Sequence, residues 1–126
     1  MIGPTTGLEK EVSTSGTVVA FTLATPGADD NTYVQGSGVA APLLGVFQFA
    51  PSTDQPQVRI RMDGISWVLI STAVTRGQPL TSDANGNGVP AAPAAGVNNY
   101  IIGFAMASGV AGQLIPVRIA PGRIQG

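Results

Sequence analysis

The side chains that could perform acid–base or nucleophilic chemistry in this sequence are few, and most of them lie in turns. The 126 residues include no histidine and no cysteine, so Ser-His-Asp and Cys-His arrangements are excluded. Lys10 would need a dry pocket to act as a nucleophile, and a polar segment near the start of the chain does not provide one. We therefore predict no catalytic residues and no enzymatic activity. Nearly all carboxylates lie in turn segments with Gly, Pro, Asn or Ser, as solvated turn residues do, or in the polar segment near the start of the chain. The full set is Glu9, Glu11, Asp29, Asp30, Asp54, Asp63 and Asp83.

One segment, residues 83–88, matches the opening of a calcium-binding loop, D-x-N-x-N-G. Position 12 of such a loop falls on Ala94, where a bidentate Glu is required, and Pro90 and Pro93 are incompatible with the exit helix. We therefore predict a glycine-rich hairpin turn at this place, with no metal and no cofactor.

The surface of the folded chain is expected to be mostly neutral. Charged residues make up 10% of the sequence, against about 25% in a typical soluble protein. A neutral polar surface costs little to desolvate and suits burial against a protein partner, but similar residues also cover ordinary loop-rich β-proteins. Composition leaves both interpretations open. With six basic residues and a net charge of −1, binding to nucleic acid is not expected.

The sequence gives no sign of a membrane segment or of a targeting signal. No run approaches the roughly 18 apolar residues of a membrane helix, and the first residues lack the apolar core of a signal peptide. We therefore expect synthesis and folding in the cytoplasm and no membrane partner.

Seventeen glycines and ten prolines divide the chain into short segments, which is typical of strands joined by turns. In residues 57–62 the apolar side chains alternate with two arginines that should face solvent. Asp63-Gly64 predicts a hairpin turn into residues 65–70, a strand that is apolar on both faces and is therefore expected at the centre of a sheet, with Trp67 in the core. Six or seven strands predict an all-β fold, either a small β-barrel or a sandwich. The remaining strands are expected at 17–23, 43–49, 74–80, 100–106 and 113–119.

Other segments are expected to lie outside central strands. Residues 25–41 contain turn residues and predict a long loop, and the tail 121–126 is expected to be irregular. Pro116 cannot donate a ladder hydrogen bond, which predicts that strand 113–119 lies at an edge or pairs on one side only. Residues 1–15 predict an extended N-terminal arm, followed by a single β-barrel domain at 16–126.

Four segments of the second half form a recognisable pattern, together covering roughly residues 64–120. The pattern resembles that of the capsid decoration (cement) proteins of tailed bacteriophages, and it consists of glycine-turn and apolar positions without a reactive group. Residues 25–41 are not part of it. The segments are GISWVLI (64–70), V-x-x-G-x-P-L-x-x-D-x-x-G (74–86), IGFA (102–105) and GQLIPVRI (112–119).

The resemblance implies a small barrel of the β-tulip type on the outer capsid surface of the virion. Such a protein binds the expanded head and stabilises the coat lattice. The implied partners are the major capsid protein and further copies of the chain, since these proteins commonly form trimers near threefold axes. They also use an N-terminal arm to grip the lattice.

The residues expected to contact protein partners lie in the arm and on strand 57–62. The arm holds few large apolar side chains, so we predict that it is mobile in the free protein and becomes ordered against coat or neighbouring subunits by strand pairing. A disordered tail without a role is the other interpretation. The two arginines are either a solvated strand face or a dock for an acidic partner. The candidate interaction residues are Ile2, Leu8, Glu9, Lys10, Glu11, Val12, Arg59 and Arg61.

A ligand-binding β-barrel, for example a carbohydrate-binding module, is the alternative to a capsid protein. Such a module is expected to expose several aromatic side chains. The sequence contains one Trp, two Tyr and four Phe, mostly on faces predicted to be buried.

Overall fold

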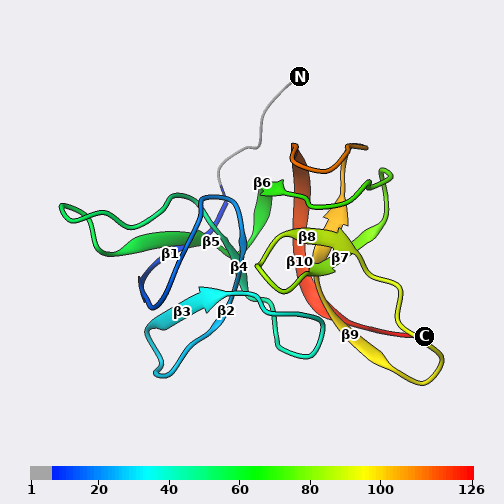
Figure 1. The fold of residues 1–126 in the computed structure, drawn as a ribbon, viewed down its shortest axis with the longest axis horizontal. Coiled ribbons are helices and arrows are strands. Elements are labelled where there is room, and N and C mark those ends of the chain that lie inside the picture. Colours follow the sequence, from blue (N-terminus) through cyan, green and yellow to red (C-terminus); the bar gives the residue numbers. More distant parts are fainter. Residues whose placement is uncertain (1–6) are drawn as a thin grey trace.

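A computed structural model describes residues 7–126 as an all-β protein, which confirms the predicted fold class. Within these residues ten strands form two sheets and there is no α-helix, so no helix could span a membrane (Figure 1). A closed barrel has the strand order β1-β3-β2-β4-β5, and a five-stranded sheet has the order β6-β10-β9-β7-β8. The strands are β1 (Glu9–Thr14), β2 (Leu23–Pro26), β3 (Thr32–Gln35), β4 (Gly45–Phe47), β5 (Val58–Arg61), β6 (Gly64–Leu69), β7 (Pro79–Ser82), β8 (Gly88–Pro90), β9 (Asn98–Ala105) and β10 (Leu114–Gln125).

The barrel is closed by β1, which pairs in parallel with β3 and antiparallel with β5. Its interior is built from Tyr33 and from small and branched apolar side chains around Phe47, which is fully buried. The alternation predicted for residues 57–62 is confirmed, because Val58 and Ile60 are fully buried and Met62 packs against the same cluster. The period of two along β5 therefore directs one face of the strand into the barrel.

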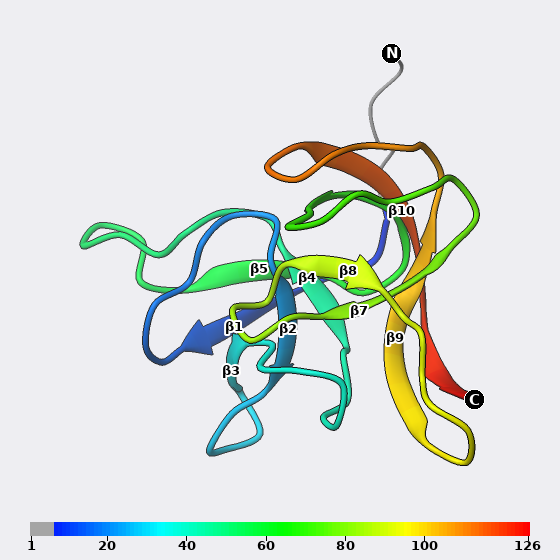
Figure 2. The ribbon, with the colours of Figure 1, turned by 45° about the vertical axis from the view of Figure 1, so that its right-hand side comes forward.

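The second sheet packs its inner face against the barrel. The inward side chains of β10, Ile115, Val117 and Ile119, belong to one buried cluster with Leu23 and Val46 of the barrel strands. The two sheets therefore share a core, and in Figures 1 and 2 the long strands β9 and β10 run side by side on the far side of it from β1 and β5. The outer face of this sheet has no strand layer over it within residues 7–126.

The predicted boundary of the N-terminal arm is wrong for residues 9–14. These residues form β1, whose register pairs Glu9 with Arg61 and Val12 with Val58. Val12 is 1% exposed, so this segment is part of the barrel and is ordered within the single chain. The first six residues of the predicted arm lie outside the described part.

The order of strand and loop between residues 16 and 41 also differs from the prediction. The expected strand 17–23 is irregular up to β2, because Phe21 adopts a φ of +65°, a conformation that bulky residues rarely adopt. The Phe21 N–H donates to the Phe47 carbonyl at 2.6 Å, and its carbonyl accepts from Leu69 N–H at 2.9 Å. This residue therefore links the barrel to β6. The expected loop 25–41 instead contains the end of β2 and all of β3, which pair with each other.

Two expectations about the second sheet are wrong. Asp63-Gly64 is a crossover between the sheets, since β5 pairs with β1 and β4 whereas β6 pairs with β10 alone at an edge. Conversely, β10 was expected at an edge but is central, because it pairs with both β6 and β9. The strand also continues after a bulge beyond Ile119 as far as Gln125, so the tail that was predicted to be irregular is part of β10. At Pro116 the strand faces Trp67 of β6 in the ladder, and its carbonyl accepts the Met106 N–H at 2.9 Å.

Candidate functional site

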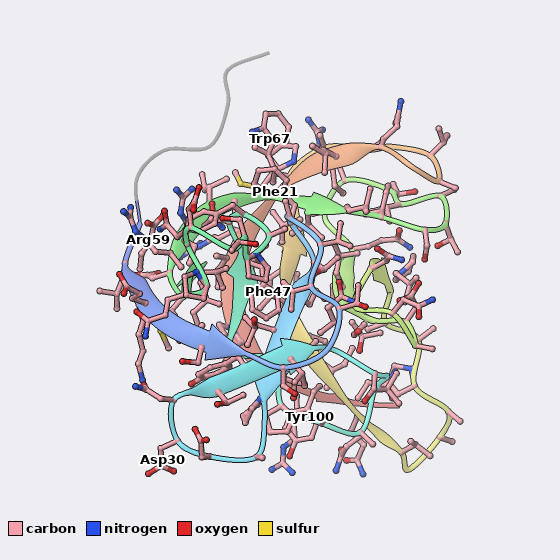
Figure 3. The ribbon with its side chains drawn as sticks, turned by 60° about the vertical axis from the view of Figure 1, so that its left-hand side comes forward. Phe21, Asp30, Phe47, Arg59, Trp67 and Tyr100 are labelled. Carbon is pink, nitrogen blue, oxygen red and sulfur yellow. The ribbon has the colours of Figure 1, made fainter. Side chains whose placement is uncertain are left out.

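Three of the predicted interaction residues form an ion-pair cluster within the chain. Arg61 Nε and Nη2 donate to Glu9 Oε2 at 3.0 and 2.8 Å, and Arg59 Nη1 lies 3.8 Å from Glu9 Oε1. Arg61 Nη1 also donates to the Ile65 carbonyl at 2.8 Å. The cluster therefore fastens β1 to β5 and to the start of β6. Arg59 is the more exposed arginine, at 56% of its side chain against 16% for Arg61, and it projects from the edge of the molecule in Figure 3.

The other predicted interaction residues are divided between surface and core. Leu8 is 65% exposed, Glu11 is exposed, and Lys10 Nζ lies 6.0 Å from the centre of the Tyr33 ring. Val12 lies in the barrel core, so its side chain is not available to a partner. Ile2 lies outside the described residues. The role of the exposed residues in binding stays a prediction.

Asp83 organises the turn between β7 and β8. Its carboxylate accepts hydrogen bonds from Ser71 Oγ at 2.7 Å and from the N–H groups of Asn85 and Asn87 at 2.8 and 2.9 Å. Partial burial raises the pKa of Asp83, but the hydrogen bonds from Ser71, Asn85 and Asn87 outweigh burial and lower that pKa below its ordinary value. The predicted hairpin turn is confirmed by the pairing of Ser82 with Gly88. From residue 7 onward, no cluster of three or more Asp, Glu, His or Cys side chains could hold a metal ion.

An exposed apolar surface, which was not predicted from the sequence, covers the outer side of β6, β9 and β10. The ladder pairs Leu69 with Leu114 and Trp67 with Pro116, so these side chains lie on one face. Phe104, Met106 and Leu114 are 42%, 45% and 42% exposed. We call this surface the outer face; its apolar members are Ile65, Trp67, Leu69, Phe104, Met106, Leu114 and Pro116.

Trp67 belongs to the outer face and not to the core as predicted. Its neighbours along β6, Ser66 and Val68, are fully buried, whereas Trp67 is half-buried. Figure 3 shows Trp67 pointing away from the body of the molecule, with Phe47 inside it. The signal was present in residues 65–70, because a strand that is apolar on both faces fits either a sheet covered on both sides or an exposed apolar face.

Arg118 lies on β10 before the bulge. It is the single charged residue in that part of β10 and in the whole of β6 and β9. In the ladder it lies between Ile65 of β6 and Phe104 of β9, so it is flanked by apolar groups on the outer face. Its side chain is exposed. Among residues 7–126 it forms no salt bridge.

A small pocket of about 260 Å³ lies at the bulge of β10. The Arg123 guanidinium is 5.7 Å from the centre of the Tyr100 ring at its border. A volume below the roughly 300–1,000 Å³ of typical ligand sites suits a single side chain better than a whole ligand. The pocket is lined by Pro42, Leu43, Leu44, Tyr100, Pro121, Gly122 and Arg123.

Comparisons with known proteins identify a similar fold and no sequence relative. No protein-family model matches the chain, and no curated protein matches it significantly. Among solved structures, the chain is similar to the N base of the head fiber gp8.5 of bacteriophage phi29, with a TM-score of 0.67 and 16% sequence identity. The similarity covers 94% of this chain and 98% of that one. At this identity the likeness establishes a shared fold over nearly the whole of both chains.

Proposed function

We propose that this chain is a structural protein of a phage head, a capsid decoration (cement) protein that binds the outer surface of the expanded head and stabilises the coat lattice. The observation that carries the proposal is the fold, which over nearly the whole chain is similar to the base of a phage head fiber. The pattern of residues 64–120 supports the same role independently of the fold, because its glycine-turn and apolar positions resemble those of capsid decoration proteins.

The proposed partners are the major capsid protein and further copies of the chain, and the proposed role is structural, not catalytic. A low density of charge favours such contacts, since 10% charged residues leave broad neutral surfaces that are cheap to desolvate. We expect a trimer, or a weakly associated monomer that becomes a trimer on the capsid.

Binding to expanded, empty heads of the encoding phage tests the proposal. Heads that lack the protein are mixed with a series of concentrations of purified chain and pelleted, and bound chain is measured against capsid protein. We expect saturable binding to expanded heads, weaker binding to unexpanded proheads, and a higher temperature of head disruption after saturation. Absence of saturable binding to both forms would refute the proposed function.

The assembly state is tested separately by analytical ultracentrifugation of the free protein and by a map of the decorated head. The expected result is a trimer on the head, with a trimer or a monomer in solution. A stable twofold dimer that persists unchanged on the head would contradict the proposed assembly without contradicting head binding.

A further inference from the structure

We propose that the outer face is the docking surface for the coat protein, and that it accepts an apolar segment carrying one carboxylate, which pairs with Arg118. This inference rests on the proposed function and adds to it the surface and the chemistry of the partner. It assigns the contact to the second sheet, whereas the residues predicted from the sequence lie in the N-terminal arm and on strand 57–62.

The outer face has the anatomy of a protein contact. Its centre is formed by cross-strand pairs of apolar side chains, Trp67 with Pro116 and Leu69 with Leu114. Phe104 and Met106, both more than two-fifths exposed, extend it over β9. Apart from Met106, which directly follows β9, these side chains stand on β6, β10 and β9, and β10 is hydrogen-bonded to the other two strands. The surface is therefore preformed and loses little conformational entropy on binding. Aromatic side chains and methionine are enriched in such contacts.

The position of Arg118 decides what kind of partner fits. Covering the outer face would remove water from a guanidinium that has apolar neighbours, Ile65 and Phe104, on both adjoining strands. A buried cation without a partner is strongly unfavourable, so a partner that supplies a carboxylate at this point is favoured. Two copies of the chain packed by the same face would bury two Arg118 side chains. The strands β6, β9 and β10 would bring no carboxylate to this contact, since the only charged residues of these strands are Arg118 and Arg123. The charge therefore favours a different protein over a second copy.

The structure supplies an internal reporter for this contact. Trp67 is the single tryptophan of the chain and lies on the outer face, on the edge strand β6 opposite Pro116 of β10. All tryptophan fluorescence that this chain contributes therefore comes from the proposed contact, without a label. Burial against an apolar segment should shift the emission to shorter wavelength and protect it from acrylamide, while binding through another surface should leave both unchanged.

The experiment compares matched variants of the full chain for binding to expanded heads. Arg118→Glu reverses the charge and should weaken binding by at least about 30-fold, while Arg118→Lys should retain part of the affinity. Phe104→Gln combined with Leu114→Gln should weaken binding by roughly tenfold.

Two control variants alter matched residues that lie off the outer face. Val97→Gln replaces an apolar residue that is 46% exposed, close to the exposure of Phe104 and Leu114. Arg123→Glu reverses the charge of the other arginine of β10, which lies beyond the bulge. Both controls should bind like the wild type, and melting curves verify that every variant is folded.

The possible outcomes separate the two proposals. If the wild type binds heads and Arg118→Glu and the double variant bind equally well, with Trp67 emission unchanged, the docking surface is wrong and the proposed function stands. If the wild type does not bind heads, both fail. If Trp67 emission shifts with protein concentration in the absence of heads, and the double variant abolishes that shift, the outer face joins copies of the chain and the assignment to coat protein is overturned.

Discussion

Glu9 on β1 and Arg61 on β5 are joined by two hydrogen bonds to one carboxylate oxygen, at 3.0 and 2.8 Å, although 52 positions separate them in the sequence. Their side chains are 22% and 16% exposed, so the pair is partly shielded from water. Arg61 extends the connection to the Ile65 carbonyl at the start of β6. The charges at the start of the chain thus close the barrel and brace the crossover between the two sheets.

Glu9→Gln should lower the free energy of unfolding by about 1 kcal/mol, because it leaves the partly buried Arg61 without its carboxylate. Urea denaturation in low salt measures this. The control is Glu11→Gln on the same strand, which removes an exposed carboxylate that forms no salt bridge in the described chain and should change stability by less than about 0.5 kcal/mol. Equal effects of the two substitutions would contradict a specific role for Glu9.

Val12→Ala should destabilise the protein by roughly 2 kcal/mol, because it opens a void in the barrel core where Val12 is 1% exposed. Leu8→Ala is the matched control, since Leu8 precedes the same strand and is 65% exposed; it should be nearly neutral. Thermal melting distinguishes the two. A Val12→Ala variant that melts like the wild type would show that β1 is not an integral strand of the barrel.

Strands that are specified by their own residues could be predicted from the sequence. The alternation of residues 57–62 gave β5, the apolar segment 100–106 overlaps β9, and the Asp83–Gly88 turn joins β7 to β8. In each case the period-two pattern or the turn chemistry is local and needs no knowledge of a distant partner.

Pairing partners could not be predicted in the same way. Gly64 has a φ of +85°, which suits a hairpin turn and a crossover equally. Which of the two forms depends on whether β6 pairs with β5 or with β10. The charged segment Glu9-Lys10-Glu11 looked like a solvated arm because its complementary residues, Arg59 and Arg61, lie about 50 positions away. The outer face was missed for a related reason: an apolar side chain indicates burial, and the sequence does not say whether its own chain or a partner covers it.

Gly103→Ala should disrupt the pairing of β9 with β10. A Cβ at Gly103 would overlap the Arg118 carbonyl oxygen, and its φ of +156° is unfavourable for other residues. Because the obstacle is backbone, we expect a loss of roughly 3 kcal/mol in chemical denaturation. Gly122→Ala, on the opposing strand with open space around it, is the control and should be close to neutral. Similar stability of the two variants would argue against the close approach of these strands.

Calcium should leave the stability of the protein unchanged. The turn at residues 83–88 begins like a calcium loop, but Asp83 already accepts hydrogen bonds from Ser71, Asn85 and Asn87, and the position of the required twelfth ligand is Ala94. Melting temperatures measured with millimolar CaCl2 and with EDTA should agree. A rise of several degrees with calcium would reveal a binding site that stabilises the folded state.

The same hydrogen bonds make the contribution of Asp83 dependent on pH. Its folded-state pKa lies below the ordinary value of 3.8, so the folded protein binds the proton less readily than the unfolded chain does. The carboxylate therefore contributes stability at every pH well above 3.8, and this contribution is lost as the pH falls through the folded-state pKa.

Asp83→Asn should accordingly lower the melting temperature at pH 7. The difference from the wild type should shrink as the pH falls below 3.8 and through the lower folded-state pKa of Asp83. The amide oxygen of Asn can still accept the backbone N–H groups, so the loss at pH 7 should be partial. Ser71→Ala, which removes the Oγ donor at 2.7 Å, should produce a smaller change of the same sign. Asp54→Asn alters the formal charge equally at an exposed position and should leave the melting temperature at pH 7 unchanged. A constant difference between wild type and Asp83→Asn from pH 7 to pH 2 would show that the ionised carboxylate contributes nothing beyond the shape of the side chain.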